Sequence, residues 1–216
     1  MMQRRTALSL LAVGAAAGGA SLFLTRPEGP AAFDLSARAQ GSVEIEDITL
    51  GDANAPVKVV EYASYTCPHC AAFHEDTFKA FKRDYIDTGR AHFTYREVFF
   101  DRYGLWAAMV ARCAGADRYF GVSDILYRTQ NEWARAGDPA AVAAALKRVG
   151  AQAGLDAAAV DACLQDAEMA ESLVAWYQAN AERDGVRSTP SFLIDGEMHS
   201  GNLSLAQLGQ LIDDAS

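Results

Sequence analysis

The tetrapeptide Cys67-Pro68-His69-Cys70 is the feature that most constrains this chain. It follows a strand-like apolar run at residues 57–62 and precedes phenylalanines that recur at helical spacing. A thiol at the start of a helix meets unpaired backbone N–H groups and the positive end of the helix dipole, which favour the thiolate. Because the thiolate is the form that attacks disulfides, the pattern predicts a redox-active dithiol.

The alternative for a CxxC pair is half of a structural zinc site, which needs two further ligands at suitable spacing. The sequence contains no second CxxC, and the other cysteines, Cys113 and Cys163, stand alone. No two histidines form an HxxxH pair. The strand-then-helix context therefore favours redox chemistry over zinc.

Residues 1–27 are expected to form a signal peptide or an N-terminal membrane anchor. The first five residues carry two arginines and no acid, and residues 7–24 contain no charge. Small residues at 18–20 suit cleavage, whereas the apolar residues 22–24 favour retention as an anchor. In either case we expect the body of the chain to lie outside the cytoplasm, in a bacterial periplasm.

The formal net charge of −9 argues against nucleic acid or an anionic membrane surface as the main partner. We expect contact with a membrane only through the N-terminal segment, if that segment is not cleaved. An oxidising compartment lets a dithiol cycle through its disulfide form and lets structural disulfides persist. The four cysteines therefore suggest two pairs.

Residues 28–42 are rich in proline, glycine and small side chains and are expected to form a linker. Strands are predicted over residues 43–50, 57–63 and 91–99. A helix is predicted from the CPHC motif to Gly89, which can adopt the left-handed conformation that ends helices. Strand, helix and strand make one βαβ unit.

Residues 101–184 are rich in alanine and periodic at 3.6 residues, so an all-helical insertion is predicted. Asp138-Pro139 and Asp156 are the expected starts of two of its helices. Residues 185–216 then predict two short strands, joined by an Asp195-Gly196 hairpin turn, and an amphipathic C-terminal helix.

A βαβ unit with CxxC at its helix start, followed by a ββα unit entered through Thr189-Pro190, resembles the thioredoxin fold. The CPHC motif, the helical insertion and the export signal together resemble the DsbA family of periplasmic thiol-disulfide oxidoreductases. The resemblance implies an α/β, thioredoxin-like fold, with a central mixed β-sheet flanked by helices and an inserted all-helical domain. Residues 43–100 and 185–216 would form the thioredoxin-like domain, and residues 101–184 the insertion.

By that resemblance Cys67 is the attacking sulfur, which faces the substrate, and Cys70 is the buried resolving one. Pro190 would be the cis-proline that faces the CxxC motif and binds substrate backbone, and Thr189 would tune the redox pair. The alternative for Thr189-Pro190 is an ordinary trans turn, since cis is a minority state for X–Pro bonds.

Three further residues are candidates for redox tuning. Glu61 lies where the family tends to place a buried acid, and the alternative is a solvated charge on the strand. Pro68 removes a backbone N–H and stiffens the turn, and His69 can supply a donor or a positive charge toward the thiolate. One departure is visible, because His74 stands where some family members have an acidic residue.

The resemblance implies an enzyme that donates its CPHC disulfide to reduced, unfolded exported proteins and is reoxidised by a membrane DsbB-like partner. It requires no organic cofactor or metal. One alternative is a disulfide isomerase or reductase, although isomerases of the DsbC type carry an N-terminal dimerisation domain and the linker is too short to be one. Another is a redox-inert chaperone or metal-binding module.

Cys113 and Cys163 lie on the apolar faces of predicted helices in the insertion. In an oxidising compartment we expect them to form a structural disulfide. Buried free cysteines are the alternative.

Overall fold

The computed structural model describes residues 43–216. The signal peptide or anchor and the linker predicted for residues 1–42 lie outside the described residues. Among residues 43–216, no helix is both long enough and apolar enough to cross a membrane.

A five-stranded mixed sheet forms the centre of the fold, in the order β1-β3-β2-β4-β5. Strands β2 and β3 are parallel, with Val57 opposite Ala91 and Ala63 opposite Glu97, and the other pairs are antiparallel. The strands are β1 (Ile48–Leu50), β2 (Val57–Ala63), β3 (Ala91–Glu97), β4 (Ser191–Ile194) and β5 (Glu197–Ser200). The predicted fold class is confirmed.

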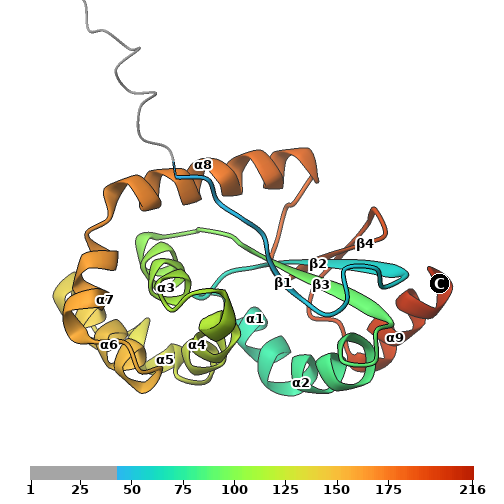
Figure 1. The fold of residues 1–216 in the computed structure, drawn as a ribbon, viewed down its shortest axis with the longest axis horizontal. Helices are drawn as coiled ribbons and strands as arrows, with labels where there is room; N and C mark the ends of the chain where they lie inside the picture. Colours follow the sequence, from blue (N-terminus) through green and yellow to red (C-terminus); the bar gives the residue numbers. More distant parts are fainter. Residues whose placement is uncertain (1–42) are drawn as a thin grey trace, which may run out of the picture. The chain divides into compact units, whose positions relative to one another are not determined.

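Helices cover both faces of the sheet (Figure 1). Alternate residues of β2 point to opposite faces, and on one face the Tyr62 hydroxyl donates to the Asn180 carbonyl and the Asp184 carboxylate. Asn180 belongs to α8 (Ala167–Arg183), which therefore packs on that face. The other face is covered by α1 (Pro68–Phe73), α2 (Lys79–Phe81) and α9 (Leu205–Asp214).

The helix that begins at the CPHC motif contains two wide, π-helical turns. These are η2 (His74–Phe78), between α1 and α2, and η3 (Lys82–Ile86), after α2. Gly89 follows with a φ of 74°, in the left-handed region predicted for the residue that ends the helix.

The predicted insertion is helical throughout its length. Its helices are α3 (Arg102–Cys113), α4 (Ala116–Arg128), α5 (Gln130–Trp133), α6 (Pro139–Gln152), α7 (Ala157–Leu164) and α8. Asp138 and Asp156 cap α6 and α7 through their side chains, as predicted. The starts of α4 and α5 have no side-chain cap that the sequence could reveal. The treatment of this insertion as a separate domain stays a prediction.

Strand β1 is shorter than predicted, because residues 43–47 are not part of the sheet. The Val43 N–H instead donates to the Ser172 hydroxyl of α8 at 3.1 Å. The Asp47 carboxylate accepts from Arg96 of β3 at 2.7 Å. Side-chain contacts of this segment thus replace the predicted strand pairing.

A disulfide joins Cys113, the last residue of α3, to Cys163 of α7, with Cα atoms 6.3 Å apart. The bond links two helices through cysteines that are 50 residues apart in sequence. The alternative of buried free cysteines does not hold in this structure.

We predict that the double variant Cys113→Ala/Cys163→Ala is less stable than the wild type. The chain-entropy estimate for a loop of this length is about 4 kcal/mol, which corresponds to a fall in Tm of roughly 10 °C for a chain of this size. Thermal unfolding followed by circular dichroism checks this. The control is Cys67→Ala/Cys70→Ala, which keeps the bond, and equal melting temperatures for the two double variants would contradict a stabilising role.

Candidate active site

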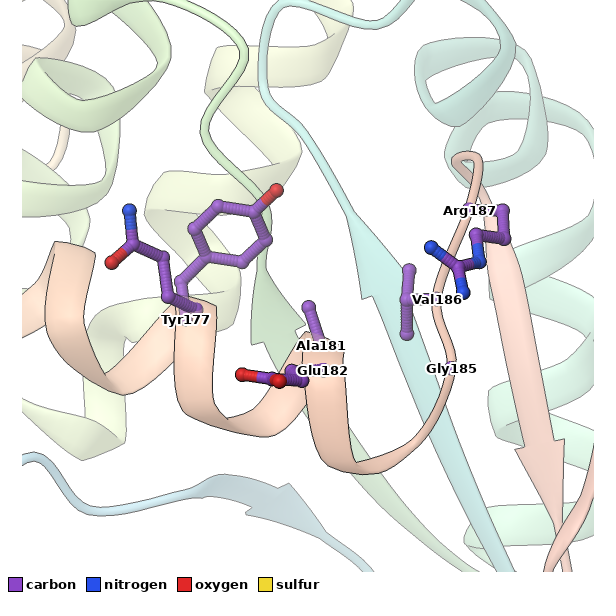
Figure 2. A pocket seen from close by; sticks show the side chains of 7 residues that line it. Tyr177, Ala181, Glu182, Gly185, Val186 and Arg187 are labelled. Atoms are coloured by element: carbon purple, nitrogen blue, oxygen red, sulfur yellow. The ribbon is translucent and has the colours of Figure 1, made fainter.

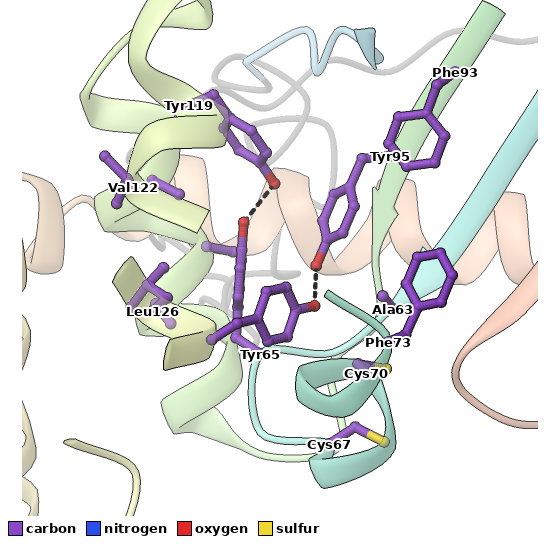
Figure 3. Close-up of a cluster of buried hydrophobic side chains, with 14 of the residues drawn as sticks. Ala63, Tyr65, Cys67, Cys70, Phe73, Phe93, Tyr95, Tyr119, Val122 and Leu126 are labelled. Atoms are coloured by element: carbon purple, nitrogen blue, oxygen red, sulfur yellow. Dashed lines mark hydrogen bonds between the residues drawn. The ribbon is translucent and has the colours of Figure 1, made fainter. Parts of the chain in front are cut away.

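The CPHC motif lies where β2 ends and α1 begins (Figure 3). Cys67 is the N-cap residue, with extended backbone angles of φ −82° and ψ 119°, and Pro68 occupies the first turn. Proline suits this position because its missing N–H would have had no partner within the helix. Cys70 is fully buried inside the helix, whereas Cys67 keeps 9% of its surface exposed. The two sulfurs therefore have different environments.

A glutamine from the helical insertion holds the loop in front of the motif. The side-chain amide of Gln130 donates to the backbone carbonyls of Tyr65 and Cys67, at 2.8 and 2.9 Å. On the other side of the loop, the Thr66 hydroxyl donates to the Asp101 carboxylate at 2.7 Å. Both contacts come from residues 101–184, so the insertion fixes the shape of the redox loop.

The pKa of Cys67 is lowered to about 5. The main cause is the hydrogen bond from the Cys70 thiol, and the Thr189 side chain and then the backbone N–H groups of Cys70 and His69 add to it. Burial opposes the effect. The Thr189 carbonyl, 3.5 Å from the Cys67 sulfur, can accept only from the protonated thiol, so the donors outweigh this contact as well.

The pKa of Cys70 is shifted in the opposite direction, well above its usual range. Burial is the largest cause, and the hydrogen bond to Cys67 and the negative charge of Glu61 add to it. At neutral pH the reduced pair therefore consists of a Cys67 thiolate and a Cys70 thiol.

The Thr189-Pro190 peptide bond is cis and lies beside the motif. The Thr189 hydroxyl is buried and has no hydrogen-bond partner among residues 43–216. The structure thus brings Cys67, Cys70, Thr189 and Pro190 together. The alternative of an ordinary trans turn does not hold.

Glu61 is completely buried in β2, so the alternative of a solvated strand charge is wrong. Its two carboxylate oxygens lie 3.0 and 3.2 Å from the His74 imidazole Nε2. His74 follows Cys70 by four residues, which places both on one side of the helix. Helical spacing from Cys70 and the family position at which His74 replaces an acidic residue are the signals in the sequence that point to His74.

Pro68 and His69 are exposed at the start of α1. His69 acts on the Cys67 sulfur through its backbone N–H. His92 and His199 lie on β3 and β5. Within residues 43–216, no three His, Cys, Asp or Glu side chains gather in a way that could hold a metal ion.

A buried polar network, which the sequence did not reveal, lies behind the motif. The Tyr65 hydroxyl donates to Tyr119 (Figure 3). Tyr119 donates to Glu97. Glu97 in turn pairs with Arg112 through two bonds of 2.7 Å. The network joins the redox loop, the end of β3 and the helices α3 and α4.

A hollow of about 370 Å³ lies between the C-terminal half of α8 and the segment that follows it (Figure 2). It is lined by Tyr177, Gln178, Ala181, Glu182, Gly185, Val186 and Arg187. This lining contains no cysteine or histidine. The redox pair is therefore not at this hollow.

The sequence profile of the thioredoxin family matches residues 44–214. The chain belongs to the thioredoxin family. Its resemblance to DsbA proteins is confirmed by the crystal structure of Wolbachia pipientis alpha-DsbA1, at a TM-score of 0.72 and 28% identity, over 81% of this chain and 92% of that one. A protein-disulfide isomerase from Novosphingobium aromaticivorans matches at a TM-score of 0.70 and 25% identity, over 79% and 97% of the two chains.

A Rickettsia typhi relative described as a protein-disulfide oxidoreductase is 31% identical over 174 residues, which cover 80% of this chain and 63% of that protein. The chain thus spans less than two thirds of the length of the Rickettsia relatives that it matches.

We predict that the Cys67 thiolate forms at unusually low pH. Titration of reduced protein, followed by the ultraviolet absorbance of the thiolate, should give a midpoint near 5. The variant Cys67→Ser should lose this transition, whereas Cys70→Ala should keep a Cys67 transition at higher pH, because the main hydrogen bond to the sulfur is removed. A wild-type midpoint close to that of a free cysteine, about 8.5, would contradict the site geometry.

Proposed function

We propose that the chain is a thiol:disulfide oxidoreductase that donates its CPHC disulfide to reduced, unfolded exported proteins and so promotes disulfide formation. The observation that carries this proposal is the pair of opposite pKa directions on sulfurs three residues apart. One sulfur is a good leaving group and the other retains its proton, as dithiol exchange requires.

In the oxidised enzyme, a thiolate of the client protein attacks the Cys67 sulfur. The Cys67–Cys70 bond breaks, and its electron pair remains on Cys70, which takes up a proton. A second client thiolate then attacks the client sulfur of the mixed disulfide, and Cys67 leaves as a thiolate. The client is oxidised by two electrons, and the enzyme disulfide is reduced by two electrons to the dithiol.

The low pKa of Cys67 supports an oxidising role for the pair. A stabilised thiolate stabilises the reduced enzyme, so the disulfide form becomes a stronger oxidant. Each pKa unit corresponds to roughly 30 mV for a two-electron couple. Pro68, His69 and Glu61 are the residues that we propose to tune this balance.

Thr189 and Pro190 are proposed to bind the client backbone beside Cys67. The distance of 3.5 Å between the Thr189 carbonyl oxygen and the Cys67 sulfur supports this proposal. The unpartnered Thr189 hydroxyl can donate to the thiolate once Cys67 ionises.

We further propose export to a bacterial periplasm, with residues 1–27 as a signal peptide or membrane anchor. A DsbB-like membrane protein would reoxidise the dithiol. Cofactor and metal are not needed for this chemistry, because thiolates transfer the electron pairs directly.

A second candidate function is disulfide isomerisation, because one structural neighbour is named a protein-disulfide isomerase. Refolding of a reduced client and repair of a scrambled client, measured side by side, separate the two. An oxidase in its disulfide form speeds the refolding of the reduced client and is consumed stoichiometrically. An isomerase in its dithiol form speeds the repair of the scrambled client. Inactivity in both assays would favour a redox-inert chaperone.

We predict opposite outcomes for the variants Cys67→Ser and Cys70→Ser. Cys67→Ser should abolish client oxidation, since the attacked sulfur is gone. Cys70→Ser, mixed with a disulfide-containing client, should accumulate a mixed disulfide on Cys67, because the Cys67 thiolate breaks the client disulfide and no Cys70 thiol is present to release the adduct. Non-reducing electrophoresis and mass spectrometry identify the adduct, and Cys113→Ala/Cys163→Ala serves as the control that retains activity. An adduct on Cys70 rather than Cys67 would reverse the assignment.

The reduction potential should depend on pH in two regimes. A depressed folded-state pKa stabilises the reduced form at high pH, and this stabilisation is lost as the pH falls through about 5. Above the pKa of Cys67, reduction by two electrons takes up one proton, so the reduction potential should fall by about 30 mV per pH unit. Below this pKa, reduction takes up two protons, so the potential should fall by about 60 mV per pH unit. Equilibration with glutathione buffers measures this, and a single slope from pH 4 to 8 would contradict the low pKa.

A further inference from the structure

Proton supply to Cys70 is a structural problem that the exchange chemistry leaves open. When the Cys67–Cys70 bond breaks, Cys70 must take up one proton, and it must lose that proton again on reoxidation. Cys70 and Glu61 are both fully buried, so neither group meets solvent directly. A proton therefore has to reach this pair through another side chain.

His74 is the one hydrogen-bond partner of the Glu61 side chain among residues 43–216. Its Nε2 lies 3.0 Å from the nearer carboxylate oxygen. The ring is held flat against Tyr127, with centroids 4.2 Å apart and an angle of 19° between the planes, and it packs against Phe78 at 4.6 Å. This packing fixes the imidazole on the carboxylate.

The same His74 side chain lines a small pocket formed by residues of η2, α2, η3 and α4. The pocket has a volume of about 220 Å³. Its lining residues are His74, Phe78, Lys79, Lys82, Phe120, Ser123 and Asp124. Lys79 and Asp124 are both solvent-exposed and form an ion pair at 3.3 Å. His74 thus contacts the buried acid with one nitrogen and borders a pocket with charged, solvent-exposed lining residues.

We propose that His74 is the positioning residue that connects Glu61 to solvent and thereby supplies and removes the proton of Cys70. This inference rests on the proposed redox function of the CPHC pair. When a client thiolate breaks the disulfide, the protonated imidazole of His74 passes its Nε2 proton to the Glu61 carboxylate, and Glu61 passes that proton to the Cys70 sulfur. The neutral imidazole that remains then takes up a proton from water. Reoxidation by a disulfide acceptor reverses each transfer.

The surroundings of His74 suit this role. Two tyrosines face the ring, Tyr127 from α4 and Tyr95 from β3, and burial raises both pKa values well above the ordinary range, so both stay neutral. The other ionisable groups near it are Glu61, Cys70 and the three exposed charges Lys79, Lys82 and Asp124. The exposed charges are paired, Lys79 with Asp124 and Lys82 with Asp87. Glu61 and Cys70 are therefore the groups whose protonation His74 can exchange.

The test is the pH profile of CPHC reduction by dithiothreitol in the oxidised full chain, measured by acid quenching and thiol alkylation. His74→Gln keeps a donor for Glu61 but cannot carry a proton. Its reduction rate should fall about tenfold or more at neutral and alkaline pH, where free protons are scarce, since proton transfer by a positioned side chain contributes at least this much. The loss should shrink at acid pH. His92→Gln is the matched control, because His92 lies on β3 and does not line this pocket, and it should keep the wild-type profile.

Non-additivity distinguishes a shared proton path from a general loss of packing. The double variant Glu61→Gln/His74→Phe removes the buried charge together with its partner and keeps an aromatic ring against Tyr127, so it is expected to fold even where a single variant does not. It should be no slower than Glu61→Gln alone, because both act on one path. A wild-type profile in His74→Gln or in the double variant, or additive losses, would overturn the proposal. The assay uses dithiothreitol and no client protein. It therefore tests the proton path even if the protein does not oxidise clients.

Discussion

Everything at the site depends on the start of α1 at the end of β2, which places two sulfurs one helical turn apart in different environments. Cys67 is at the N-cap, where backbone N–H groups favour its thiolate. Cys70 is inside the helix, where burial favours its thiol. Neither residue would have these properties in an isolated CxxC peptide, because both arise from the sheet and helix around it.

The helical insertion contributes to this arrangement from a distance in sequence. Gln130 lies 63 residues after Cys67, yet its amide binds the carbonyl oxygen of that cysteine. Tyr119 of α4 connects Tyr65, two residues before Cys67, to Glu97. Buried polar groups are costly unless they are paired, and here they pair with one another across three elements. The insertion therefore shapes the redox loop as well as enlarging the core.

Local patterns predicted most of the fold, because strand alternation, helix caps and the CPHC context each act over a few residues. The caps at Asp138 and Asp156 are examples. The extent of β1 was not predictable, since Val43 and Asp47 bind side chains more than forty residues away. The contact between Glu61 and His74 was equally hidden. It joins a strand to a π-helical turn, and the helical spacing from Cys70 indicates the side of the helix on which His74 lies but not its partner on the strand.

Two buried carboxylates lie on the parallel strands β2 and β3, and their partners differ in a way that matters chemically. Glu97 pairs with Arg112, whose guanidinium stays charged at every accessible pH, so this pair can only hold the structure. Glu61 pairs with the imidazole of His74, a side chain that, unlike a guanidinium, can both donate and accept a proton. His74 pairs with Glu61, the acid whose charge acts on Cys70. Arg112 pairs with Glu97, the acid that joins β3 to the insertion. The partner side chain thus decides the role of each carboxylate: Glu61, beside His74, is suited to proton exchange, whereas Glu97, beside Arg112, connects elements of the fold.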